Sequence, residues 1–292
     1  MANNTNNILG VRFKADLTLL LVAILWGSAF TAQRMVAQLG SVYLFNGARF
    51  LLASVVLIPF IRNNRISRGQ VFWMVAAGIL VFIASALQQA GMISTTAGNA
   101  GFITSLYVII VPVLLFLGWK EKTHWLLWLA VILAAFGAYL LSTGGKFETR
   151  DGDLLEMAGA VLWAGHVILL GKVANRFDFL TFAAGQFFIA GLLNSVIGMW
   201  LESPVVLTTL KLQIAILYTA VLSVAVGYTL QIWAQRHTPP TDASLILCLE
   251  AVFAVIAGWM ILGESLTDLQ IAGCSLIILA VLLAQVRAFG FR

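Results

Sequence analysis

Two ionisable residues lie deep inside apolar stretches of this sequence, where a charge is costly. Arg49 lies about eight residues into one stretch, and Glu250 lies seven residues into another. A charged side chain in hydrocarbon costs about 2.5–3.5 kcal/mol on insertion scales, so it usually faces a polar cavity or a partner. We predict that Glu250 couples proton movement to transport or binds a substrate amine, and that Arg49 faces a polar cavity. Structural roles remain open: Glu250 joining its helix to a neighbour, and Arg49 paired with a carboxylate or with helix-end carbonyls.

Aromatic residues recur on one face of two stretches. Trp26, Phe30 and Gln33 share a face of the first stretch, and Trp163 and His166 share a face of the sixth. Such a wall suits cation–π contact with an ammonium group or stacking with an aromatic substrate, and ordinary helix packing is the alternative. Other polar side chains at membrane depth are predicted to face inward because lipid would leave them unsatisfied. The residues assigned here to the substrate site are Trp26, Arg49, Gln89, Asn99, Tyr107, Trp163, His166 and Gln186.

Small residues form a seam on the fourth and ninth stretches. Ala97, Gly101 and Ser105 follow one another at helical spacing, and Ser244 and Cys248 occupy the matching positions later in the chain. Small side chains allow close helix packing, so the two helices are expected to pack around a shared axis. The same seam allows a substrate to approach Ser244, which completes the predicted substrate site.

The elements that carry these residues are apolar runs of about 20 residues, the length needed to cross a hydrocarbon core about 30 Å thick. The chain of 292 residues is 61% hydrophobic and 10% charged, with a mean hydropathy of +0.98. We therefore predict an all-α membrane protein with ten transmembrane helices. The predicted spans are 15–37, 42–61, 70–91, 99–119, 124–143, 154–174, 180–201, 213–235, 243–262 and 269–287.

The distribution of basic residues predicts the orientation. With these spans, 12 of the 17 Lys and Arg residues fall on the side of the two termini, three fall on the opposite side, and two lie inside spans. Cytoplasmic loops carry an excess of Lys and Arg. Both termini are therefore predicted to be cytoplasmic, in a multi-pass inner (plasma) membrane protein. The net charge of +5 is spread over these short loops and does not indicate nucleic-acid binding.

The two halves of the chain resemble each other at regular intervals. Trp26 and Trp163 are separated by the same interval as Phe50 and Phe187, here called the first repeat interval. A later block keeps a slightly longer second repeat interval, in the pairs Gln88 and Gln231, Ala100 and Ala243, and Glu121 and Glu264. Each half, 1–143 and 144–292, holds five predicted spans, so the second half must enter the membrane from the opposite side. Inverted repeats of this kind commonly build transporters with a binding site at the midplane.

Several segments carry a resemblance to a known family. They are AILWGSAF at 23–30, GARFLLA at 47–53, AGNAGFITSLYVIIVPVL at 97–114, ASLILCLEAVFAVIAGWMILGESL at 243–266 and QIAGCSLIILAVLLA at 270–284. In order and spacing the chain resembles the drug/metabolite transporter superfamily, and within it the ten-helix EamA-type exporters. It departs from the family pattern at GWKEK (118–122), where an LGE ending is usual. It also departs at Val255, where the family tends to have a proline matching Pro112; this predicts unequal kinking of the two halves.

The resemblance implies a basket of helices around a central cavity. Spans one to four and six to nine would line the cavity, with spans five and ten at the periphery. Relatives export amino acids, other metabolites or toxic cations from bacteria, or carry sugar phosphates and nucleotide sugars in organelles. Exporters of aromatic and other amino acids are the relatives that the resemblance favours.

The function predicted from these observations is secondary active transport, with export of amino acids or related small metabolites by alternating access. Multidrug or cationic-toxin efflux is the alternative, followed by translocation of nucleotide sugars, sugar phosphates or lipid-linked sugars. No GxxxxGK[ST] motif is present, so ATP is not expected to drive transport directly. No enzyme activity, cofactor or metal is expected, because Glu250 is taken as the only deep carboxylate and two histidines lie at loop edges. The expected partners are a small-molecule substrate and the lipid bilayer, and the protein is expected to be a monomer or a weak homodimer.

Overall fold

The computed structural model describes residues 2–61, 66–95, 97–143, 150–203, 210–262 and 266–290. Throughout these segments the chain forms helices and connecting turns, without strands. Among the described residues, nine helical stretches are long and apolar enough to span a membrane, and Trp125–Leu141 forms a shorter apolar helix. The prediction of an all-α, ten-helix membrane protein is confirmed. Glu264, the predicted repeat partner of Glu121, and residues 144–149 at the predicted boundary lie outside the described residues.

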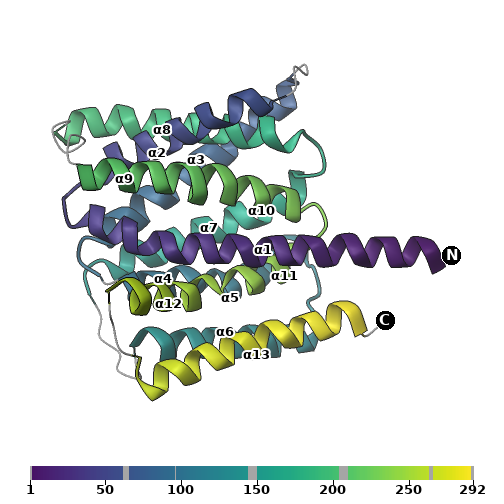
Figure 1. The fold of residues 1–292 in the computed structure, drawn as a ribbon. Helices are drawn as coiled ribbons and strands as arrows, with labels where there is room; N and C mark the ends of the chain where they lie inside the picture. The colour runs from purple at the N-terminus through teal and green to yellow at the C-terminus, as the bar shows by residue number, and fades with distance from the viewer. Residues whose placement is uncertain are drawn as a thin grey trace.

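The helices of the first half run back and forth along the bundle. They are α1 (Ala2–Ala37), α2 (Tyr43–Leu57) with the 3₁₀ turn η1 (Ile58–Phe60), α3 (Arg68–Gly91), α4 (Ala97–Ser105), α5 (Tyr107–Trp119) and α6 (Trp125–Thr143). The second half follows the same order, as α7 (Asp153–Val173), α8 (Phe179–Leu201), α9 (Leu210–Tyr218), the π-helical segment η3 (Thr219–Tyr228), α10 (Thr229–Ala234), α11 (Pro240–Leu247), α12 (Glu250–Leu262) and α13 (Asp268–Gly290). The start of α1 and the end of α13 lie at the same end of the bundle (Figure 1), here called the terminus end.

Two spans that the sequence predicts as single helices are divided at equivalent positions. The amide of Leu106 donates to the carbonyl of Ile103 (3.2 Å) between α4 and α5. The amide of Leu249 donates to the carbonyl of Ile246 (3.1 Å) between α11 and α12. These i→i−3 bonds tighten one turn of each span. Leu106 and Leu249 are separated by the second repeat interval, so the same local distortion occurs once in each half.

Proline is not the cause of these divisions. Pro112 lies inside α5, beyond the division at Leu106, and the second half is divided as well although Val255 stands at the matching position. The divisions therefore do not depend on proline, and unequal kinking at Pro112 and Val255 stays a prediction.

Helix packing relies on close backbone contacts. At Gly27 in α1, a side-chain carbon would lie 2.6 Å from the carbonyl oxygen of Glu250, so only glycine lets α1 approach the start of α12 this closely. Gly137 and Gly273 bring α6 against α13 in the same way. These two helices lie together at one edge of the bundle (Figure 1), as the family resemblance implies. At the centre, α4 contacts α12 and α5 contacts α11, which confirms that the fourth and ninth spans pack together.

Candidate functional site

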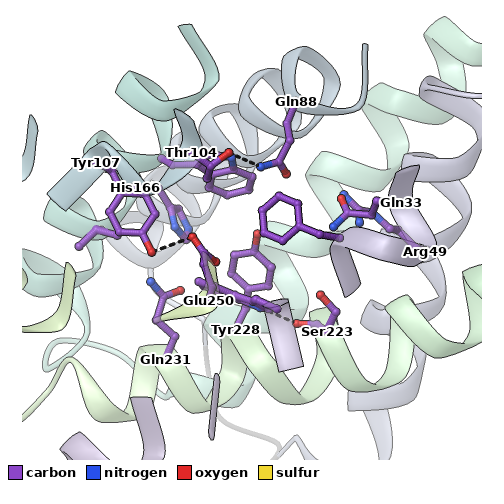
Figure 2. A pocket seen from close by; sticks show the side chains of 14 residues that line it. Gln33, Arg49, Gln88, Thr104, Tyr107, His166, Ser223, Tyr228, Gln231 and Glu250 are labelled. Carbon is purple, nitrogen blue, oxygen red and sulfur yellow. Dashed lines mark hydrogen bonds between the residues drawn. The ribbon is translucent and has the colours of Figure 1, made fainter. Parts of the chain in front are cut away.

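A cavity lies at the centre of the bundle, where the divided spans meet α1, α2, α3, α7 and the π-helical segment (Figure 2). Its volume, counted as the space that the centre of a water molecule can occupy, is about 40 Å³. Its lining residues are Trp26, Phe30, Gln33, Arg49, Gln88, Thr104, Tyr107, Trp163, His166, Val167, Ser223, Tyr228, Gln231 and Glu250. The fifth and tenth spans, α6 and α13, contribute none of these lining residues, which agrees with their expected peripheral place. The seventh span, α8, was expected to line the cavity and contributes none of the lining residues, because it packs against α2 and α3.

Glu250 begins α12 at the division of the ninth span and is 2% exposed. Its Oε1 atom accepts a hydrogen bond of 2.9 Å from the hydroxyl of Tyr107, which begins α5 at the other division. The second repeat interval separates the two residues, so they are repeat equivalents that meet across the centre of the bundle. The glutamate faces the cavity and also joins α12 to α5, as its structural alternative predicted. Its role in proton coupling or amine binding stays a prediction.

Arg49 enters the cavity from α2 and is 3% exposed. Its guanidinium carbon lies 4.9 Å from the ring centre of Phe45 and 5.0 Å from that of Phe50. Among the described residues no ion pair involves Arg49, and its Nε atom has no hydrogen-bond partner there. The structural alternative predicted that Arg49 pairs with a carboxylate or with helix-end carbonyls. The described residues provide neither partner.

Tyr228 is the centre of the aromatic wall. Its ring centre lies 4.6 Å from that of Trp26 and 5.9 Å from those of Trp163 and His166. The indole nitrogen of Trp26 donates to the carbonyl of Ser223 (3.0 Å), which holds Trp26 against the π-helical segment. In Figure 2, Arg49 and Glu250 lie on different sides of the cavity.

Several buried polar atoms of the lining have no hydrogen-bond partner within the described chain. They are Nε of Arg49, Nε1 of Trp163, Nδ1 of His166, Oε1 of Gln33, and both polar atoms of the Gln231 amide. Buried polar groups are nearly always hydrogen-bonded to protein or solvent. Their convergence on one cavity indicates a place where a polar ligand or water satisfies them.

The structure brings together six of the ten residues predicted for substrate binding or proton coupling: Trp26, Arg49, Tyr107, Trp163, His166 and Glu250. The other four lie outside the cavity lining. Gln89 donates to the carbonyl of Gln33 (2.9 Å), and Oε1 of Gln186 lies within hydrogen-bond distance of Nε2 of His166 (3.0 Å).

The remaining two residues also have hydrogen-bond partners outside the cavity lining. Asn99 donates to Asp153 (2.7 Å), and the Ser244 hydroxyl donates to the carbonyl of Thr241 within its own helix (2.8 Å). Both are thus satisfied away from the centre of the bundle.

Some functional candidates were missed. Gln88 and Gln231 both line the cavity, and their match across the repeat is the signal that would have selected them. Glu250 is not the only buried carboxylate, because Glu156 in α7 is 0% exposed and accepts a hydrogen bond from Thr104 (3.4 Å). The same Thr104 hydroxyl accepts from the Gln88 amide (2.9 Å), so Glu156 is connected to the cavity lining.

Comparison with known proteins agrees with this architecture. Residues 13–143 and 150–285 match the EamA-like transporter family. The chain belongs to this family. The EamA-family chain is 32% identical over 276 residues to an Archaeoglobus fulgidus protein named an uncharacterized transporter, covering 94% of this chain and 87% of that one. It is 25% identical to a Chlamydia trachomatis protein named an S-adenosylmethionine/S-adenosylhomocysteine transporter, covering 87% of this chain and 86% of that one. A solved crystal structure shares the fold with a TM-score of 0.79 at 14% identity, over 94% of this chain and 98% of that chain.

Proposed function

We propose that this EamA-family transporter exports amino acids or related small metabolites across the inner membrane by alternating access, with a proton gradient as the energy source. The observation that carries the proposal is the pair of unlike charged groups in one cavity. Arg49 and Glu250 both line it, on different sides, and no ion pair between them is found among the described residues.

An α-amino acid matches this arrangement because it carries a carboxylate and an ammonium group on one small frame. The guanidinium of Arg49 is suited to a carboxylate, which it binds through two parallel hydrogen bonds. The carboxyl group of Glu250 and the faces of Trp26 and Tyr228 suit the ammonium end. The Trp163 indole and the Gln231 amide supply unpartnered polar atoms for the rest of the molecule.

Proton coupling follows if the substrate ammonium and a proton compete for Glu250. Protonation of Glu250 would then release the substrate, and loss of the proton would prepare the site for the next molecule. The hydroxyl of Tyr107 donates to the carboxyl group of Glu250 and fixes its position beside α5.

The small size of the cavity supports a closed intermediate of such a cycle. A water molecule needs about 10–15 Å³ of this kind of space, so about 40 Å³ holds only a few waters. A metabolite must therefore enter when the helices around the cavity move apart. The Chlamydia trachomatis relative is in line with the proposed substrate class, since S-adenosylmethionine carries an α-amino-acid group.

The test is transport by the purified protein in proteoliposomes. Each of the 20 common amino acids is assayed, and every one that is transported is then compared with its decarboxylated amine. Truncating one partner of a buried hydrogen-bonded charge pair costs about 2–5 kcal/mol, and about 1.4 kcal/mol is a factor of ten. Arg49→Gln is therefore expected to raise the half-saturating concentration of the amino acid about 30-fold or more, without changing that of the amine. Arg68→Gln, at the exposed start of α3, is the control and should change neither.

Glu250→Gln tests the coupling. It is expected to abolish proton-driven efflux while the protein is expressed at normal levels. Efflux that keeps its dependence on the proton gradient in this variant would remove Glu250 from the mechanism, and equal loss of amino acid and amine in Arg49→Gln would remove the carboxylate assignment.

Efflux of toxic organic cations is the second candidate, because the aromatic wall stands beside Glu250. Arg49 in the same cavity would repel such a substrate. A cationic dye such as ethidium separates the two: if it is transported by the parent protein, and better by Arg49→Gln, the cation function is the correct one.

A further inference from the structure

A polar cluster on the terminus end ties the two halves of the chain together. Asp16 in α1 accepts hydrogen bonds from Nε of Arg12 (2.9 Å and 3.0 Å) and from the hydroxyl of Thr238 (2.7 Å). Arg12 also donates through Nη2 to Asp242 in the first turn of α11 (2.7 Å). Asp16, Thr238 and Asp242 are 6%, 1% and 3% exposed. This terminus-end cluster connects α1 of the first half to the turn before α11 and to α11 itself, in the second half.

A second polar cluster lies at the opposite end, around Asp153 at the start of α7. Its Oδ1 atom accepts from the hydroxyl of Thr95 (2.7 Å) and from the amide of Asn99 (2.7 Å). Its Oδ2 atom accepts from the backbone amide of Arg150 (2.9 Å). This opposite-end cluster connects α7 of the second half to the turn before α4 and to α4 itself, in the first half.

The two clusters are built from repeat-equivalent positions. The first repeat interval separates Asp16 from Asp153. The second separates Thr95 from Thr238, and Asn99 from Asp242. In both clusters a threonine hydroxyl donates to an aspartate at 2.7 Å. One arrangement thus occurs twice, once at each end of the bundle, and each copy crosses between the halves.

One position distinguishes the clusters. Asn99 donates directly to Asp153, whereas its counterpart Asp242 is a second carboxylate beside Asp16 and has no amide to donate. Arg12 lies between Asp16 and Asp242 and binds both. Arg12 is therefore the hydrogen-bond donor to the aspartate at the terminus end, as the Asn99 amide is at the opposite end.

We propose that these clusters are the two gates of the transporter: the terminus-end cluster closes the route from the cavity to that face of the membrane, and the opposite-end cluster closes the route to the other face. The inference rests on the proposed alternating-access function. When two inverted halves rock against each other, contacts that cross between them at one end must separate while those at the other end persist. Both clusters are formed in this structure, at opposite ends of the bundle whose centre holds the cavity.

The gates are tested by the access of a cavity thiol from each face, a measurement that needs no substrate. The parent carries Cys248→Ala and Cys274→Ala, which replace the two native cysteines, and Ser223→Cys as the reporter in the cavity lining. A membrane-impermeant maleimide is applied to sealed vesicles of each orientation, and the labelling rate is measured.

Arg12→Ala is expected to raise labelling about tenfold from the terminus face alone, and Asn99→Ala to raise it similarly from the opposite face alone. The milder pair Thr238→Val and Thr95→Val should show the same sidedness, which keeps the test decisive if an alanine variant fails to fold. Lys14→Ala is the matched control, since it removes a positive charge from an exposed position of the same helix, and it should leave both rates unchanged.

The asymmetry between the clusters gives a rescue experiment. In Arg12→Ala combined with Asp242→Asn, the new amide can donate to Asp16 as Asn99 donates to Asp153, so labelling from the terminus face should return to the parent rate. The proposal is overturned if the variants of the two clusters raise labelling from the same face, if neither raises it, or if the combined variant labels as fast as Arg12→Ala. If the protein transports no amino acid but the variants of the two clusters still raise labelling from opposite faces, the substrate assignment is wrong and the gate proposal stands.

Discussion

Replacing Gly27 by alanine is expected to separate α1 from α12 and to destabilise the protein. The added carbon would lie 2.6 Å from the carbonyl oxygen of Glu250 and from Cβ of Phe253, and 2.8 Å from the backbone nitrogen of Ala254. Ordinary contact begins at 3.4 Å, so the two backbones must move apart by about 0.8 Å at this point. Two of the obstacles are backbone atoms, which cannot turn away as a flexible side chain could.

The magnitude follows from comparison with a glycine that has room. At Gly165 in α7 nothing lies within 4 Å of an added carbon. Alanine is favoured over glycine in a helix by about 1 kcal/mol, and this gain is common to Gly27→Ala and Gly165→Ala. Overpacking a filled site costs about 1–3 kcal/mol. The difference in stability between the two variants should therefore be about 1–3 kcal/mol, with Gly165→Ala the more stable.

The native Cys248 thiol reports this difference. It is 0% exposed, so a thiol-reactive fluorescent dye labels it in detergent only as the protein unfolds. Cys274→Ala removes the less buried thiol from the signal in all samples. If Gly27→Ala unfolds at the same temperature as Gly165→Ala, the close approach of α1 to α12 is not required by the fold.

Two further predictions concern the turns at the terminus end. Arg236 donates to the carbonyls of Ala174 (2.9 Å) and Phe177 (2.5 Å), so Arg236→Ala should lower stability by about 1–3 kcal/mol; an unchanged unfolding temperature would show that these bonds are not needed. Burial and the neighbouring charge of Arg236 lower the pKa of His237 below 6.5, so the unfolded chain binds a proton more readily and stability should fall slightly as the pH drops below 6.5. This loss should be smaller in His237→Gln, and an equal loss in parent and variant would assign the pH dependence to other groups.

The transmembrane architecture was predictable because it depends on properties that a linear sequence displays. Runs of about 20 apolar residues specify spans, and the matches of Trp26 with Trp163 and of Gln88 with Gln231 specify the repeat. The division of the fourth and ninth spans was not predictable. It shifts a few hydrogen bonds around Leu106 and Leu249 without any residue that breaks helices.

The site was predictable only in part, because polarity shows that a side chain needs a partner and does not show which one. Arg49 and Glu250 have no local partner and face the cavity. Asn99 and Ser244 are also polar, yet Asn99 donates a hydrogen bond to Asp153 and Ser244 donates one to a carbonyl one turn away. Tyr228 contacts the rings of Trp26, Trp163 and His166 in the cavity, but its place depends on the π-helical segment, which has no sequence signature that we recognised.

Because the two halves are joined in one polypeptide, repeat-equivalent residues such as Tyr107 and Glu250 can differ from each other. If each half were a separate copy of the same chain, the two residues facing each other on the axis would be identical, giving two phenols or two acids. A single continuous gene lets one position keep a lone acid while the other evolves into its donor. The acid at this position is thereby present once per molecule, next to a phenol and not next to a second acid.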